Sequence, residues 1–254
     1  MIDLHSHLLP GVDDGARTVE QAVATLHEMA RHGVTDVCLT PHLTATQAEH
    51  GVPPRHDTAF EALHAAAPRS PRLHRGSELM LDRPLSRAAA GHAGIRLGGT
   101  RYVLVEFTRL VAGETVTRAL AHVLSLGLVP VLAHPERYTC CSVTAVHRWR
   151  SMGALMQVDA TTLLSPQGRG HRARQLVAAG LADLLAADNH GDVRMLLTGR
   201  RMLEDHGGIV QADLLTARNP AAILADQPTQ LAEPLELKTS LLERLRRLLK
   251  SGDE

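Results

Sequence analysis

Short apolar segments alternate with helical patterns along most of the chain, and this alternation limits the fold more than any other feature. Apolar runs predict seven strands, at residues 2–5, 36–40, 72–78, 102–107, 130–134, 154–159 and 183–188. Apolar residues at helical spacing predict helices at 19–32, 115–126 and 169–179, and a glycine follows each of them. The order strand, helix, glycine, strand is typical of parallel βα units.

The strand segments show little alternation of polar and apolar residues. The runs YVLVEF, VPVLAH and ADLLAAD are nearly continuous apolar stretches, as expected of parallel strands that are covered on both faces. Seven βα units predict a closed or nearly closed α/β barrel, and functional residues gather at the carboxyl ends of the strands in such barrels. We expect residues 1–227 to form this domain.

Composition excludes several classes of protein. The 254 residues contain 27 Lys and Arg and 27 Asp and Glu, so a nucleic-acid or membrane surface is not indicated. We see no apolar run of about 18 residues and no signal-peptide core, and therefore expect no stable membrane insertion. Three cysteines, Cys38, Cys140 and Cys141, form no disulfide framework and suit a reducing cytoplasm.

Two segments outside the strand pattern have expected roles. Residues 45–70 are polar, and we interpret them as a loop at the mouth of the site that leads into a helix. Residues 228–254 are expected to be a tail whose leucines line one face of a helix at 240–250. That helix is expected to pack on the barrel or on a partner subunit. A basic helix at a membrane surface is the alternative.

Potential metal ligands follow nearly every expected strand. His5 and His7 project to the same face near the end of the first strand, where neutral imidazoles can bind one borderline metal ion. The acidic turn at Asp13 and Asp14 can add an oxygen ligand, although an acidic turn before a helix is also common. Further candidates end later strands or follow them: His42, Glu78, Glu106, His134, Asp188 and His190.

Each candidate is ambiguous when it is considered alone. Glu78 has the position of a carboxylate that bridges two metals. Glu106 lies inside an apolar run, so it needs a partner, either a metal or an arginine. Their joint occurrence at strand ends indicates a metal centre. Competing catalytic motifs are missing, because no cysteine has the spacing of a phosphate loop and there is no Gly-x-Ser-x-Gly elbow or Walker loop.

With these residues identified, the chain resembles the polymerase and histidinol phosphatase (PHP) superfamily of metal-dependent phosphoesterases. More narrowly, it is similar to the bacterial manganese-dependent protein-tyrosine phosphatases encoded with capsule and exopolysaccharide genes. The resemblance rests on the opening MIDLHSHLLPGVDDGARTVEQA, on TPHLT, GSEL, VLVEF, LAHPERY and AADNHG, on the strand with Gln157, and on Asn219-Pro220. It covers residues 1–226 and implies a distorted, TIM-like (β/α)7 barrel.

The resemblance implies three metal sites. The first would be held by His5, His7, Glu78 and Asp188, and the second by Glu78, Glu106 and His134, with Glu78 as the bridge. The third would be held by His42, His190 and one residue of the acidic pair, with Asp14 preferred over Asp13. Two to three divalent ions are implied, with manganese as the expected metal and iron or zinc as alternatives. Arg137 is implied as a phosphate ligand, and Arg194 as a second one.

The implied activity is hydrolysis of phosphotyrosine. The implied substrate is a phosphotyrosine protein, the tail of a membrane-attached tyrosine kinase that controls capsule or exopolysaccharide synthesis. A homo-oligomer is compatible with the sequence. One alternative is a small-molecule phosphoesterase of the same superfamily, such as a histidinol-phosphate phosphatase. Another is a PHP scaffold that binds metal without catalysis.

Overall fold

Two parallel β-sheets form the centre of the protein. The computed structural model describes residues 1–237. One sheet has the strand order β1-β2-β4, and the other has the order β3-β5-β6-β7-β8-β9. The strands are β1 (Ile2–Ser6), β2 (Asp36–Leu39), β3 (His42–Thr44), β4 (Arg72–Arg75), β5 (Glu78–Met80), β6 (Tyr102–Glu106), β7 (Val129–Ala133), β8 (Leu155–Asp159) and β9 (Leu184–Ala186).

The expected strand at 36–40 is present as β2, but the expectation of a single strand at 72–78 is wrong, because β4 ends at Arg75 and β5 begins at Glu78 in the other sheet. A further short strand, β3, follows β2 and also belongs to the other sheet. The first break falls at Thr40 and Pro41, where proline has no N–H to continue a ladder. The second break falls at Gly76 and Ser77, where the chain crosses from the β4 sheet to the β5 sheet.

The expected α/β architecture with parallel strands is present, but these strands form two sheets and not one closed ladder. The sheets are connected at both sides. Two short crossings of the chain, from β2 to β3 and from β4 to β5, join them at one side. An isolated parallel bridge between Ser6 and Asn189 joins the edges near β1 and β9 at the other side. As a result, the carboxyl ends of the strands face one region.

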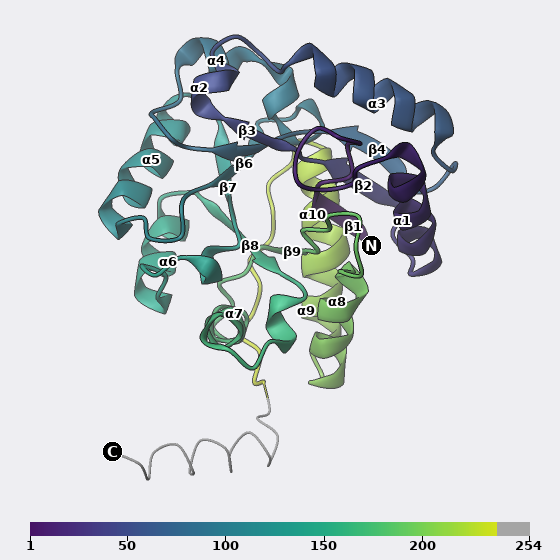
Figure 1. Ribbon diagram of the computed structural model, residues 1–254. Coiled ribbons are helices and arrows are strands. Elements are labelled where there is room, and N and C mark those ends of the chain that lie inside the picture. The colour runs from purple at the N-terminus through teal and green to yellow at the C-terminus, as the bar shows by residue number, and fades with distance from the viewer. Residues whose placement is uncertain (238–254) are drawn as a thin grey trace.

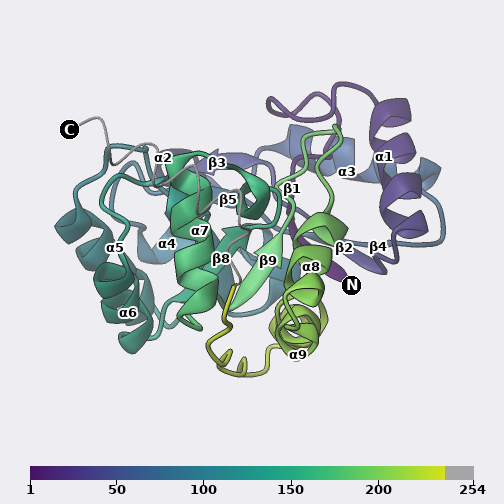
Figure 2. The ribbon, with the colours of Figure 1, turned by 90° about the horizontal axis from the view of Figure 1, so that it is seen from below.

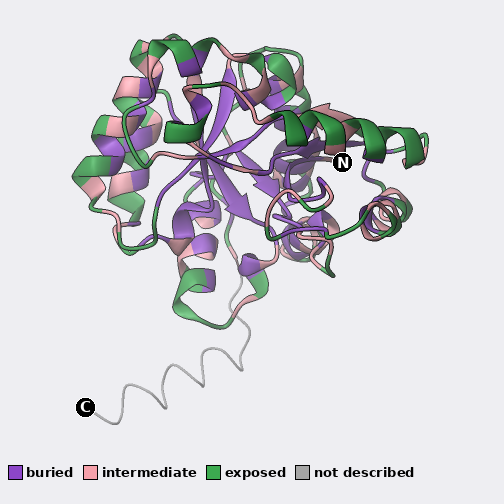
Figure 3. Cartoon of the chain, turned by 45° about the horizontal axis from the view of Figure 1, so that its top comes forward, coloured by how far each residue is buried: buried purple, intermediate pink, exposed green. Residues whose placement is uncertain are grey.

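Helices cover the outer faces of both sheets (Figures 1 and 2). Most strands are coloured as buried in Figure 3, with β4 as an exception, whereas the helices are exposed along their outer sides. The helices are α1 (Val19–Arg31), α2 (Ala45–Ala48), α3 (Pro54–Ala66), α4 (Arg87–Gly91), α5 (Gly113–Ser125), α6 (Val143–Ser151), α7 (Gly168–Ala178), α8 (Leu196–Asp205), α9 (Ile209–Asp213) and α10 (Asn219–Leu224).

The expected helices at 19–32, 115–126 and 169–179 correspond to α1, α5 and α7. The segment 45–70 is more helical than expected, because α2 and the 13-residue α3 occupy most of it. The expected helix at 240–250 lies outside the described residues.

An inner apolar cluster fills the space between the sheets. Leu4, Cys38, Leu104 and Val131 contribute to it from four strands, and Ile223 of α10 packs against the same cluster. Along β6 the neighbours of Leu104 belong instead to the cluster beneath the outer helices, as expected from alternating side-chain directions. This apolar cluster packs against the strands next to the ends that carry the polar candidate residues, and it supports those residues.

A buried ion pair stabilises the amino end of β9. Arg150 of α6 donates to both carboxylate oxygens of Asp183 at 3.0 and 2.7 Å, and Met156 N donates to Asp183 Oδ2 at 2.8 Å. We predict that Arg150→Met lowers the free energy of unfolding by about 3 kcal/mol, because it leaves a buried carboxylate without its cation. Urea denaturation measures this change.

The control is Arg148→Met. Arg148 pairs with Glu114, and both side chains are 61% exposed. Removing this exposed pair should cost about 1 kcal/mol or less. Equal losses in the two variants would contradict the structural role assigned to the Arg150–Asp183 pair.

Candidate metal centre

The candidate ligands from the sequence lie together, at the carboxyl ends of β1, β6, β7 and β9 and at the amino ends of β3 and β5. They come from β1 and the loop after it, from the first residues of β3 and β5, from the last residue of β6, and from the segments that follow β7 and β9. Four groups of side chains present ligand atoms within 4.8 Å of one another, and each of the nine candidates belongs to at least one group. The nine are His5, His7, Asp14, His42, Glu78, Glu106, His134, Asp188 and His190.

Glu78 lies at the centre of these groups. Its Oε2 atom is 3.3 Å from His5 Nε2, 3.2 Å from His7 Nε2 and 3.1 Å from His42 Nδ1. Its Oε1 atom is 2.9 Å from His134 Nε2. The side chain is only 1% exposed, so four imidazoles replace water around one buried carboxylate.

Asp188 is a second point of convergence. Its Oδ1 atom lies 3.3 Å from both His5 Nε2 and His7 Nε2. Asp188 and His134 both adopt positive φ angles, of 50° and 35°. Non-glycine residues rarely adopt this conformation, and it often marks functional sites because the surrounding structure must offset the strain. The backbone at two strand ends is therefore shaped to aim these side chains inward.

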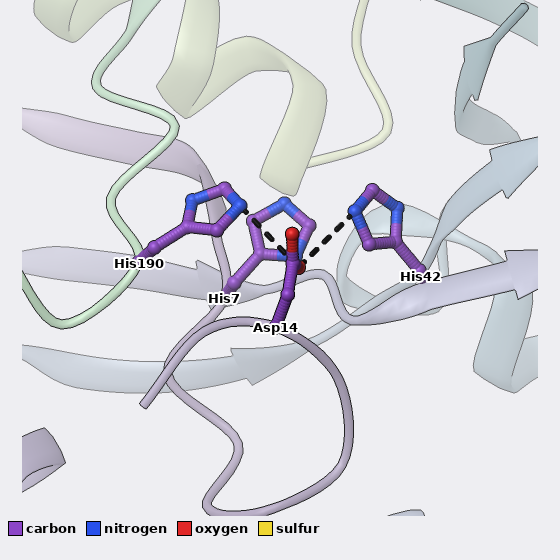
Figure 4. Close-up of side chains that lie close together, drawn as sticks. All are labelled: His7, Asp14, His42 and His190. Atoms are coloured by element: carbon purple, nitrogen blue, oxygen red, sulfur yellow. Dashed lines mark ion pairs between the residues drawn. The ribbon is translucent and has the colours of Figure 1, made fainter. Parts of the chain in front are cut away.

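Asp14 and Asp13 have different positions. Asp14 Oδ1 lies 3.5 Å from both His42 Nε2 and His190 Nε2, with His7 between them (Figure 4). Asp13 Oδ2 instead accepts hydrogen bonds from His7 Nδ1 at 2.8 Å and from His42 N at 3.0 Å. A Cβ atom on Gly15 would lie 1.9 Å from the His7 carbonyl oxygen, so only glycine fits in this turn.

The grouping of the side chains differs in one respect from that implied by the resemblance. Glu106 Oε1 lies 3.1 Å from His42 Nδ1, and Glu106 is grouped with His42 and Glu78. His134 is grouped with His5 and Glu78. The two members expected to share the second site with Glu78 thus fall in different groups, and Glu78 belongs to both.

The spacing of the ligand atoms fits metal ions. Two atoms that each lie about 2.1 Å from one ion are about 3.0 Å apart at a right angle and about 3.4 Å apart at a tetrahedral angle. His5 Nε2 and His7 Nε2 are 3.1 Å apart, and their distances to Glu78 and Asp188 are 3.2–3.3 Å. Mixed imidazole and carboxylate ligands suit divalent manganese, iron and zinc.

The electrostatics of the cluster indicate a need for positive charge. Burial opposes ionisation of Glu78, but His5 and its other imidazole neighbours outweigh burial and hold its pKa well below the usual value. Burial also opposes protonation of His42, yet the Glu106 and Glu78 carboxylates raise its pKa to about 10. The carboxylates therefore favour positive charge at His42, and a bound cation would also supply positive charge to them.

Both arginines named from the sequence lie at the edge of the cluster. Arg137 NH2 contacts Asp188 Oδ2 and lies 2.6 Å from Asp159 Oδ2. Arg194 NH1 lies 3.4 Å from Asp188 Oδ2, and the same side chain pairs with Asp192. Two guanidinium groups therefore meet at one carboxylate oxygen, and both side chains keep more than a quarter of their surface exposed.

Sequence reasoning did not assign roles to two buried residues of β8, Gln157 and Asp159. Gln157 Oε1 lies 2.9 Å from His5 Nδ1, and Asp159 contacts Arg137. Asp159 was detectable, since it is a polar residue at the end of an apolar strand like the nine candidates. Gln157 lies within its strand, and although that strand is part of the family resemblance, the resemblance implied no role for this residue.

The cysteines lack the properties of a nucleophile. Burial raises the pKa of Cys38 and Cys141 to about 12, so both remain protonated thiols near neutral pH. Burial also raises the pKa of Cys140.

Comparison with known proteins identifies the family of this chain. A family model described as capsular polysaccharide synthesis, CpsB/CapC, matches residues 1–225. The chain belongs to the CpsB/CapC family. It is 28% identical to the tyrosine-protein phosphatase CpsB of Streptococcus agalactiae serotype V, over 88% of this chain and 98% of the relative. It is 27% identical to CpsB of Streptococcus pneumoniae, over 89% and 99%.

The fold also matches a solved structure. That structure comes from work on YwqE of Bacillus subtilis and CpsB of S. pneumoniae, described as metal-dependent tyrosine phosphatases. The TM-score is 0.78 at 24% identity, over 94% of this chain and all of the other chain. Within residues 1–237, none of the helices is long and apolar enough to cross a membrane.

The two aspartates of the acidic turn provide a test of the site. We predict that Asp14→Ala reduces the metal content by about one ion per chain and leaves the melting temperature in excess chelator unchanged, because the Asp14 side chain is 70% exposed. Asp13→Ala should lower the melting temperature in chelator, because three hydrogen bonds to its carboxylate are lost.

Elemental analysis and thermal unfolding measure the two effects separately. The opposite result would be full metal content in Asp14→Ala, together with loss of one ion and unchanged stability in Asp13→Ala. That result would make Asp13, and not Asp14, the metal ligand.

Proposed function

We propose that the protein is a metal-dependent phosphatase that hydrolyses phosphotyrosine in proteins. One observation carries this proposal: buried carboxylates and imidazoles converge on Glu78, with two arginines beside them. The names of the CpsB relatives support the same activity. The sheets, joined at both sides, are consistent with the distorted PHP-type barrel, which we retain as the description of residues 1–227.

The proposed ligands are the nine side chains of the cluster. His5, His7, Glu78 and Asp188 would hold one ion, and Asp14, His42 and His190 would hold another. Glu106 and His134 would complete a further site with Glu78 as the shared carboxylate. Contacts of Glu78 with four imidazoles support this bridging role. We propose manganese as the metal, with iron and zinc as alternatives.

Different residues of the chain would bind the metal ions and the phosphate during hydrolysis. When bound, divalent ions lower the pKa of a water molecule to provide a nucleophile and offset charge on the phosphoryl oxygens. Arg137 and Arg194 would bind phosphate oxygens through charge-assisted hydrogen bonds. The Arg137 side chain is 29% exposed, so substrate can reach the guanidinium. A tyrosine leaving group has a pKa of about 10 and needs little help from a general acid.

The proposed substrate is a phosphotyrosine protein, such as the tail of a membrane-attached tyrosine kinase that acts in capsule or exopolysaccharide synthesis. The family supports a role in that process. A cytoplasmic location is part of the proposal, and three free cysteines support it.

A phosphatase assay tests this function. We expect the purified protein to hydrolyse phosphotyrosine peptides in the presence of manganese, iron or zinc, and to lose activity in excess chelator. Glu78→Gln should abolish turnover and lower the metal content, because it removes the shared negative charge but keeps the size of the side chain. Glu49→Gln, at a carboxylate paired with Arg83, is the control and should leave both unchanged.

Full activity in chelator would contradict the metal mechanism. Faster hydrolysis of histidinol phosphate than of phosphotyrosine peptides would favour a small-molecule phosphatase. Bound metal without turnover of either substrate would favour a scaffold.

A separate prediction concerns Arg137. Arg137→Lys keeps the positive charge but loses the planar fork, so kcat/KM for phosphotyrosine peptides should fall roughly 10- to 150-fold, corresponding to about 1.5–3 kcal/mol. Metal content should not change. Arg109→Lys, in the exposed loop after β6, is the matched control. Unaltered kinetics of Arg137→Lys would remove Arg137 from the phosphate site.

A further inference from the structure

Strand β8 differs from its neighbours at the site. Adjacent strands β7 and β9 are each followed by candidate ligands, whereas none of the nine candidates comes from β8. Two polar side chains of β8 are nevertheless buried beside the cluster. Gln157 is 0% exposed and Asp159 is 2% exposed, and each contacts one residue of the proposed site.

Gln157 contacts the ring nitrogen of His5 that faces away from the cluster. Gln157 Oε1 is 2.9 Å from His5 Nδ1, while His5 Nε2 points at Glu78 and Asp188. An amide oxygen only accepts hydrogen bonds, so this contact places the His5 proton on Nδ1. The lone pair of Nε2 is then directed at the cluster, as a metal ligand requires.

A purely structural role does not account for Gln157. Its amide nitrogen is buried and has no hydrogen-bond partner. An unsatisfied buried donor is unfavourable, so an apolar side chain of similar size would fill this position at lower cost to folding. The advantage of glutamine at this position is its hydrogen bond with His5.

Asp159 fixes the position of Arg137 in a comparable way. Its Oδ1 atom accepts hydrogen bonds from Thr161 N, Thr161 Oγ1 and Thr162 N at 2.8–3.1 Å. These three donors leave Oδ2 directed at Arg137 NH2, 2.6 Å away. The guanidinium is thus held by NH2, and its buried Nε atom stays free of protein partners.

We propose that β8 is the positioning strand of the centre: Gln157 sets the metal-binding tautomer of His5, and Asp159 holds Arg137 in place for the phosphate. The inference rests on the proposed function only for Arg137. The His5 part concerns metal binding and does not require turnover.

The test compares the metal affinity and phosphate affinity of three variants of the full chain. Gln157→Leu should weaken manganese binding roughly 10- to 100-fold in titrations against a chelator. Gln157→Glu keeps an acceptor oxygen for His5 Nδ1 and should restore affinity to within a few-fold of wild type. Asp159→Asn should leave manganese affinity unchanged.

Asp159→Asn is expected to weaken phosphate binding instead. The two Asp159 oxygens accept four hydrogen bonds, three from Thr161 and Thr162 and one from Arg137. An asparagine replaces one of these oxygens with an NH2 group, which cannot accept and would face at least one of the four donors. Affinity of the manganese-loaded protein for inorganic phosphate should fall roughly tenfold, and KM for phosphotyrosine peptides should rise more than kcat falls. If this variant does not fold, Asp159→Ala removes the anchor without adding a donor.

Asp183→Asn is the matched control. It disrupts another buried Asp–Arg pair, at the opposite end of the neighbouring strand β9, and should lower stability without changing either affinity.

Unchanged manganese binding in Gln157→Leu, or unchanged phosphate binding in Asp159→Asn, would overturn the corresponding half of the proposal. Loss of both affinities in Asp183→Asn would indicate general disruption and also overturn it. If wild type lacked phosphatase activity but the manganese pattern held, the proposed function would fail while the role of Gln157 stood.

Discussion

The buried carboxylate of Glu78 is the constraint on which the rest of the site depends. A carboxylate removed from water is strongly unfavourable unless positive charge surrounds it. Here four imidazoles, two from strands β1 and β3 and two from the segments after β1 and β7, lie 2.9–3.3 Å from its oxygens. The parallel strands bring these groups together from distant parts of the chain, and the inner apolar cluster beneath them provides a rigid support. The fold thus creates an environment that a divalent cation would neutralise.

The division of the strands into two sheets contributes directly to this arrangement. After the chain crosses between sheets, β3 and β5 begin with His42 and Glu78, and these two residues are paired in the parallel register. The crossings at Thr40-Pro41 and Gly76-Ser77 therefore place two candidate ligands side by side. A continuous strand would carry the same residues, but it would not start a new sheet at them.

Much of this could be predicted from the sequence because the relevant signals are local. The apolar runs gave the strand positions, and the polar residues at their ends gave the nine candidates that the structure brings together. The break between β4 and β5 was missed although Gly76 marks it, and the separate short strand β3 after Pro41 was not expected. The pairing of Glu106 with His42, and the contacts of Gln157 and Asp159, depend on three-dimensional distances that no residue spacing encodes.

The most direct test of the account is a crystal structure of the manganese-loaded protein with anomalous scattering data. We predict two or three anomalous peaks among the nine candidate ligands, with Glu78 bound to more than one ion. Gln157 should remain at His5 Nδ1 while His5 Nε2 binds metal. Absence of any peak near Glu78 at full manganese occupancy in solution, or peaks bound by other residues, would contradict the central claim that this buried carboxylate organises a metal centre.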